Sequence, residues 1–199
     1  MSNKTLEFHF DFVSPAAYLA HTQLPKISAE TGAKPQMYPM LLGGVFKATG
    51  NASPVSVPAK GRWMQADLAR WAKRWGAPFV LNPHFPIQTL PLMRGACGLL
   101  MHQPNDFRRY VDAAFKAIWV DQRNLNDAAE IESVLTEAGF DPQAFMALAG
   151  DPAVKADLVA RTEASVARGA FGAPTFFVGS KMFFGQDRLD FVQEALAKG

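Results

Sequence analysis

A chain of 199 residues, 49% of them hydrophobic, is long enough to bury the core of one or two domains. Its net charge of +2 is too small to predict binding to nucleic acid or to an anionic membrane. No apolar run approaches the roughly 20 residues of a membrane span, and the N-terminus lacks a signal-peptide pattern. We therefore expect a soluble, cytoplasmic protein.

The chain begins with a pattern typical of a strand that leads into a helix. A strand is predicted over residues 5–11 because phenylalanines recur with period two, at Phe8, Phe10 and Phe12. Ser14 is a favoured N-cap and Pro15 suits a first helical position, which predicts a helix over residues 15–31. An anion such as a thiolate would be stabilised at this helix start. An ordinary helix cap is the alternative interpretation of Ser14.

The rest of the chain alternates between long helical patterns and a few strands. A short strand is expected at 36–40, whereas repeated Gly and Pro residues predict loops over 43–58. Helices are then predicted at 58–75, around 107–118, and at 127–138, 141–149 and 152–168. The chain ends with a predicted hairpin of strands 175–178 and 181–184, followed by a helix that starts at Asp187.

This order of elements predicts an α/β fold in which a thioredoxin-like sheet carries a large all-helical insertion. Residues 1–46 and 165–199 would form the discontinuous thioredoxin-like domain, and residues 47–164 the helical insertion domain.

The only cysteine of the chain, Cys97, excludes one function for such a fold. Thioredoxin-like redox proteins carry a reactive Cys-x-x-Cys at the turn where this chain has Ser14. A single cysteine forms no internal disulfide, so a disulfide oxidoreductase is excluded. Cys97 lies in an apolar run and is expected to be a buried hydrophobic residue. Any sulfur used in chemistry must then arrive on a ligand.

Pro174 directly precedes the strand predicted at 175–178. Thioredoxin-like folds carry a cis-proline at this place, facing the active-site turn, so we expect the Ala173-Pro174 bond to be cis. The backbone of Ala173 would then pair with an extended peptide ligand, as in strand addition. A trans-proline that simply starts an edge strand is the alternative.

Two further motifs combine charges with loops or helix starts. Asp187 and Arg188 follow Gly185 and would suit the ammonium and carboxylate groups of an α-amino acid. A helix cap beside a solvated charge is the alternative there. Asn51 and Lys60 lie in the loop-rich stretch, where Lys60 is misplaced for a helix start unless it binds an anion. Loop solvation is the alternative for this pair.

These motifs, in this order, resemble the family of 2-hydroxychromene-2-carboxylate isomerases and the related kappa-class glutathione transferases, which share the DsbA-type architecture. The resemblance covers essentially the whole chain and rests on Phe10-Asp-Phe-Val-Ser14-Pro, Thr49-Gly-Asn51, Pro58-Ala-Lys60-Gly61, Gly169-Ala-Phe-Gly-Ala-Pro174-Thr and Phe184-Gly-Gln-Asp187-Arg188-Leu. The segment His84-Phe-Pro86-Ile-Gln88-Thr89 is more similar to the isomerase branch, with Gln88 where that branch usually has Asn.

The resemblance implies a glutathione site with no metal, in a cytoplasmic homodimer that takes part in aromatic compound catabolism. Ser14 would be the catalytic residue that stabilises the glutathione thiolate. The implied glutathione-binding residues are Asn51, Lys60, Ala173, Pro174, Gln186, Asp187 and Arg188. The aromatic substrate would contact Phe46, Lys60, Trp63, Phe85 and Pro86.

The implied reaction interconverts 2-hydroxychromene-2-carboxylate and trans-o-hydroxybenzylidenepyruvate, or a related aromatic enone acid, through reversible thiolate addition. Two other functions remain open on the sequence. One is a transferase that leaves glutathione attached to an electrophile, and the other is a non-catalytic peptide-binding module.

Overall fold

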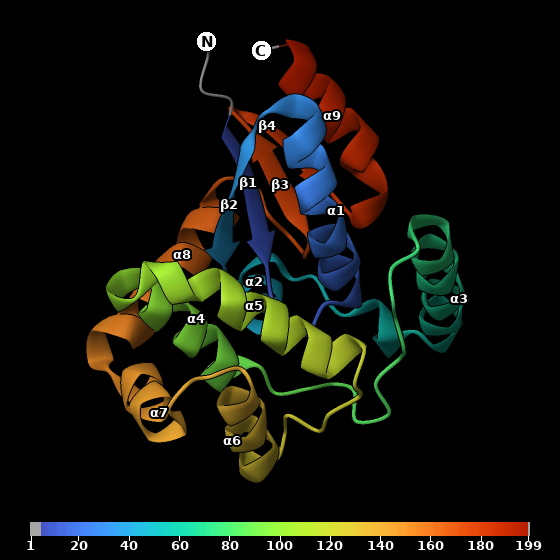
Figure 1. The fold of residues 1–199 in the computed structure, drawn as a ribbon. Helices are drawn as coiled ribbons and strands as arrows, with labels where there is room; N and C mark the ends of the chain where they lie inside the picture. Colours follow the sequence, from blue (N-terminus) through green and yellow to red (C-terminus); the bar gives the residue numbers. More distant parts are fainter. Residues whose placement is uncertain (1–4, 199) are drawn as a thin grey trace.

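The computed structural model describes residues 5–198 and shows a small sheet at one end of a mainly helical molecule (Figure 1). Along the described chain the elements are β1 (Thr5–Phe10), α1 (Pro15–Thr31), β2 (Lys34–Pro39), α2 (Leu42–Thr49), η1 (Pro54–Ser56), α3 (Pro58–Trp75), α4 (Leu90–His102), α5 (Pro104–Trp119), α6 (Ala128–Glu137), α7 (Pro142–Gly150), α8 (Pro152–Ala167), β3 (Thr175–Val178), β4 (Lys181–Phe184), η2 (Gln186–Arg188) and α9 (Leu189–Lys198).

The sheet has the strand order β2-β1-β3-β4. β1 and β2 are parallel, which requires a crossover connection, and α1 provides it. β3 pairs antiparallel with both β1 and β4. This order is the thioredoxin-like sheet that the sequence predicts, and the helices α2 to α8 lie between its two halves in the chain.

Alternation along β1 gives the sheet two different faces. Phe8 and Phe10 are fully buried, and the ring of Phe8 lies 6.4 Å from that of His21 on α1. His9 points to the opposite face, where its Nδ1 lies 2.8 Å from the Ser165 hydroxyl of α8. The sheet is therefore covered by α1 on one side and by α8 on the other.

An aromatic cluster joins the sheet to the helical block. Phe12, just beyond β1, packs edge-on against Phe115 of α5 at 5.0 Å between ring centroids. The indole nitrogen of Trp119 donates to the Phe12 carbonyl at 2.9 Å. Each fully buried side chain of this size contributes about 1.5–3 kcal/mol relative to exposure. The turn that follows Phe12 is therefore fixed by packing from both sides.

The prediction of loops over residues 43–58 is wrong for much of that region. Residues Leu42–Thr49 form the helix α2, and Pro54–Ser56 form a short 3-10 turn. A Cβ atom on Gly44 would lie 3.1 Å from Thr162 Cγ2 on α8, so close packing between the two helices favours glycine there. Gly44 therefore reflects a tertiary contact, which a local pattern does not reveal.

Most other boundaries agree with the sequence within a few residues. β2 starts at Lys34, two residues earlier than predicted, and a 3-10 turn precedes the last helix, which begins at Leu189. The predicted domain boundaries fall inside α2 and α8, and the division into two domains stays a prediction. Among residues 5–198, none of the helices is long and apolar enough to cross a membrane.

Candidate active site

A cavity of about 1060 Å³ lies where the start of α1, the segment from α2 to α3, the approach to α4 and the loops around β3 and η2 meet. Every site residue predicted from the sequence lines it, namely Ser14, Phe46, Asn51, Lys60, Trp63, Phe85, Pro86, Ala173, Pro174, Gln186, Asp187 and Arg188. These residues come from five separate segments of the chain, so the fold brings the dispersed motifs together.

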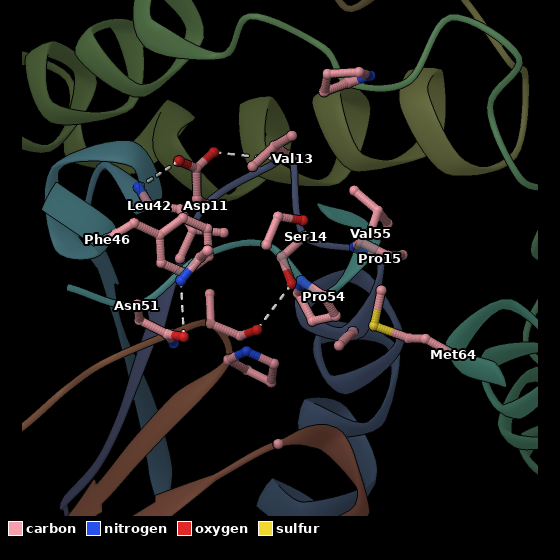
Figure 2. Close-up of a pocket in the computed structure, with 18 of the residues that line it drawn as sticks. Asp11, Val13, Ser14, Pro15, Leu42, Phe46, Asn51, Pro54, Val55 and Met64 are labelled. Atoms are coloured by element: carbon pink, nitrogen blue, oxygen red, sulfur yellow. Dashed lines mark hydrogen bonds between the residues drawn. The ribbon is translucent and has the colours of Figure 1, made fainter. Parts of the chain in front are cut away.

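Ser14 caps α1 as the sequence predicts. Its Oγ accepts a hydrogen bond from the Ala17 N–H at 3.1 Å. It donates one to the Ala173 carbonyl at 3.0 Å, the dashed line that leaves Ser14 in Figure 2. The side chain is buried and lines the cavity. A hydroxyl has a single proton, so donation to a ligand requires only that the O–H turn away from Ala173.

The peptide bond before Pro174 is cis, which confirms the prediction. The carbonyl of Ala173 already accepts from Ser14, while no acceptor among residues 5–198 is recorded for its N–H. The carbonyl of Pro174 accepts from the Gly185 N–H at 3.0 Å, which ties this wall to the turn before η2. Ala173 therefore lines the cavity beside Ser14 with a backbone N–H that has no partner among residues 5–198.

Gln186 and the ion pair next to it form the polar end of the cavity. Gln186 is 8% exposed, and its amide has no recorded hydrogen bond with the described part of the chain. Arg188 donates to the Asp187 carboxylate at 2.7 Å, so the two charges pair with each other here. We expect Asp187 to contact an ammonium group and Arg188 a carboxylate. For this, the ion pair between Asp187 and Arg188 must break, or each side chain must bind the ligand while it keeps that ion pair.

Asp11 is the residue of the site that the sequence analysis missed. It is 1% exposed, and its carboxylate accepts from the Thr89 hydroxyl at 2.6 Å. It also accepts from the Leu42 N–H at 2.8 Å and the Val13 N–H at 3.1 Å (Figure 2). Its own carbonyl accepts the Ser14 N–H at 3.1 Å. Asp11 thus shapes the Ser14 turn and fastens α2 and the start of α4 to it.

Burial raises the pKa of Asp11, and the three donors oppose that rise. All three partners donate, which is the arrangement that an ionised, acceptor-only carboxylate requires. The Asp in Phe10-Asp-Phe-Val-Ser14 was the available signal, but its partner Thr89 lies 78 positions away in the chain.

The opposite wall is aromatic and more exposed. Trp63, at the start of α3, is 64% exposed, and Phe85 packs against Trp119 at 6.0 Å between ring centroids. The Phe85-Pro86 bond is also cis, which the sequence analysis did not predict. Asn51 donates to the carbonyl of Phe171 at 2.8 Å and thereby bridges the two sides of the cavity.

Lys60 and Cys97 differ in their access to the cavity. Lys60 lines the cavity and has no recorded ion pair or hydrogen bond within residues 5–198, so its ammonium group is available to an anion. Cys97 is fully buried in α4, as expected, and does not line the cavity. Burial, with the nearby charge of Asp157, raises the pKa of its thiol to about 12. The only thiol of the chain is thus buried and held in its protonated form.

Comparison with known proteins identifies the family of the chain. The model of the DSBA-like thioredoxin domain matches residues 5–197. A 2-hydroxychromene-2-carboxylate isomerase of Sphingobium xenophagum is 34% identical, covering 97% of this chain and 98% of its own. Glutathione S-transferase kappa 1 of Caenorhabditis elegans is 29% identical over 96% of this chain and 90% of its own.

A solved structure of a 2-hydroxychromene-2-carboxylate isomerase superposes with a TM-score of 0.86 at 27% identity, covering 98% of this chain and 95% of that one. The resemblance seen in the motifs is therefore confirmed over the full length of the chain. The chain belongs to the DSBA-like thioredoxin family and, within it, to the family of the 2-hydroxychromene-2-carboxylate isomerases.

Proposed function

We propose that this protein is a glutathione-dependent isomerase that interconverts 2-hydroxychromene-2-carboxylate and trans-o-hydroxybenzylidenepyruvate, or a closely related aromatic enone acid. The isomerase relatives support the reaction class, and the kappa-class relatives support the use of glutathione. The observation that carries the proposal is the meeting of Ser14, the free Ala173 N–H and the unpaired Gln186 amide in one cavity.

The residues present fit a glutathione molecule. A thiolate would lie at the N-terminus of α1, where the helix dipole and the Ser14 hydroxyl favour negative charge. The Ala173 N–H would donate to a peptide carbonyl, as in strand addition. Gln186, Asp187 and Arg188 are suited to the charged γ-glutamyl end. The cavity of about 1060 Å³ leaves room for a second, aromatic molecule.

Glutathione, when bound, supplies a thiol that adds reversibly to the double bond of an enone and leaves again after rotation, with no net redox change. The chain's own residues bind and orient the reactants. Ser14 turns its O–H from Ala173 toward the sulfur and holds it as the anion. Lys60 binds the carboxylate of the substrate, while Phe46, Trp63 and the Phe85-Pro86 pair contact its ring.

An assay of both reactants tests this function. Purified protein is mixed with 2-hydroxychromene-2-carboxylate, and formation of the benzylidenepyruvate is followed by absorbance with and without glutathione. We expect turnover only with glutathione, and full recovery of free glutathione at equilibrium. S-methylglutathione, which lacks the thiol, is the matched control and should bind without supporting turnover.

The same assay separates the alternatives. Accumulation of a glutathione adduct would show a transferase, as in the kappa-class relatives. Turnover without glutathione would refute the proposed cofactor, and absence of both turnover and glutathione binding would leave the peptide-binding module. A cytoplasmic location and a homodimer are part of the same proposal, by analogy with the family that the motifs resemble.

A further inference from the structure

A second cleft lies on the far side of α2 from the candidate active site. It has a volume of about 460 Å³ and is formed by one face each of α2, the start of α4 and α8. On α2, residues such as Phe46 line the large cavity, whereas Gly44, Lys47 and Ala48 line this cleft. The cleft therefore adjoins the large cavity, because Leu41 and Leu90 line both. Arg94, Lys155, Leu158 and Val159 line only the cleft.

The floor of this cleft is apolar. Leu158 is fully buried, while Leu90 is 37% and Val159 is 55% exposed. Leu41 and Val166 complete the floor, and the small side of α2 at Gly44 and Ala48 leaves the space open. Exposed leucine and valine side chains gathered in a hollow of this size are typical of a binding site for an apolar group.

Cations from three different elements surround this floor. They are Lys47 on α2, Arg94 on α4 and Lys155 on α8. Arg94 and Lys155 are partly buried, and none of the three has a recorded ion pair within residues 5–198. On the same helix α8, by contrast, Arg161 pairs with Asp157 at 2.6 Å. Partly buried charges without partners favour an external anion.

We propose that this cleft binds an anionic amphiphile, a carboxylate with a short aliphatic body. The apolar body would lie on Leu158 and Val159, and the carboxylate would contact Arg94 and Lys155. Glu163 is the only acidic residue of the lining, so with Lys47, Arg94 and Lys155 the net charge of the lining is positive. The lining contains no aromatic ring, which argues against a nucleobase as the ligand.

The binding is tested with octanoate as the probe, by titration into ¹⁵N-labelled protein while amide chemical shifts are followed. We expect shifts at residues that line the cleft, and weaker binding of octan-1-ol, which has the same body without the charge. The variant Arg94→Gln/Lys155→Gln should weaken octanoate binding at least about fivefold, the effect of two lost exposed or partly exposed ion pairs.

A matched variant controls for the change in net charge. Lys34→Gln/Lys181→Gln removes two exposed charges from β2 and β4, outside the cleft, and should leave binding unchanged. Ala48→Trp, at an exposed position of α2, should block the cleft without touching the cations. Each variant is first required to give a folded spectrum.

Several results would overturn the proposal. Equal binding by both double variants would remove the role of Arg94 and Lys155, and full affinity in Ala48→Trp would place the ligand elsewhere. Chemical-shift changes confined to residues of the large cavity would also place octanoate outside the cleft. Shifts of cleft residues that depend on protein concentration without octanoate would assign this surface to a second copy of the chain.

Discussion

The two sides of the large cavity are built differently. On one side, Ser14 is 5% exposed and bonded to Asp11, Ala17 and Ala173, so its position is fixed by three other residues. On the other side, Trp63 is 64% exposed, and its helix α3 stands at the edge of the molecule (Figure 1). Under the proposed function, the fixed Ser14 side would carry the chemical step, and the exposed α3 side would determine which substrate binds.

The largest effect is expected on the fixed side, from Ser14→Ala. Loss of this donor should raise the pKa of the bound glutathione thiol and slow isomerisation by about 100-fold, the scale of one lost oxyanion-type donor. Stopped-flow turnover and thiolate absorbance against pH measure the two effects. Unchanged turnover would assign the stabilisation to the backbone N–H groups of α1 alone.

Asp11→Asn tests whether the fixed side depends on the carboxylate behind it. An amide keeps the shape but leaves one of the three donors facing an NH₂ group, so we expect turnover to fall about tenfold, the equivalent of about 1.5 kcal/mol for a hydrogen bond to a charged group. Thr89→Val, which removes one of those donors, is the matched variant. If both variants lowered the free energy of unfolding in urea but kept turnover, Asp11 would stabilise the fold without contributing to catalysis.

At the polar end of the cavity, Arg188→Ala should weaken binding while leaving the chemistry intact. We expect the KM for glutathione to rise about fivefold with kcat nearly unchanged, the signature of uniform binding loss. Initial rates at saturating and limiting glutathione separate the two constants. A loss of saturated turnover with undiminished binding would place Arg188 on the reacting substrate.

On the exposed side, Trp63→Ala should have a smaller effect that depends on the substrate. We expect kcat/KM to fall about threefold for an aromatic enone acid, in keeping with the roughly 0.5–1.5 kcal/mol of an aromatic contact. The KM for glutathione should not change. Equal losses for large and small substrates would contradict a role in substrate selection.

The smallest effect is expected from Cys97→Ala. Because Cys97 lies outside the cavity with its thiol pKa raised to about 12, turnover should stay within about twofold of the unmodified protein, since a thiol reacts as its thiolate. Iodoacetamide at pH 8 should not label Cys97 in the folded protein. Rapid labelling accompanied by inactivation would show that the protein's own sulfur takes part.

Local sequence signals were sufficient to predict the elements whose start or turn depends on a few neighbouring residues. Ser14 and Pro15 predict a helix start by their own conformational preferences, and Gly179-Ser180 marks the β3–β4 turn. α2 escaped prediction because Gly44 is favoured by its close packing against Thr162, which is distant in sequence. The role of Asp11 escaped for the same reason, since its partners Leu42 and Thr89 come from other elements.

The predicted site residues line one cavity, because five motifs together resemble one family, while their roles stay a prediction. The structure adds how these motifs are bonded. The Ser14 hydroxyl donates to the Ala173 carbonyl, and Arg188 pairs with Asp187. No pattern in the sequence indicates either contact.

A crystal structure of the protein with glutathione tests the central claim most directly. The account predicts the sulfur within hydrogen-bond distance of Ser14 Oγ, a hydrogen bond from the Ala173 N–H to the tripeptide, and the γ-glutamyl end beside Gln186 and Asp187. Glutathione bound with its sulfur on the α3 side, away from Ser14, would contradict it.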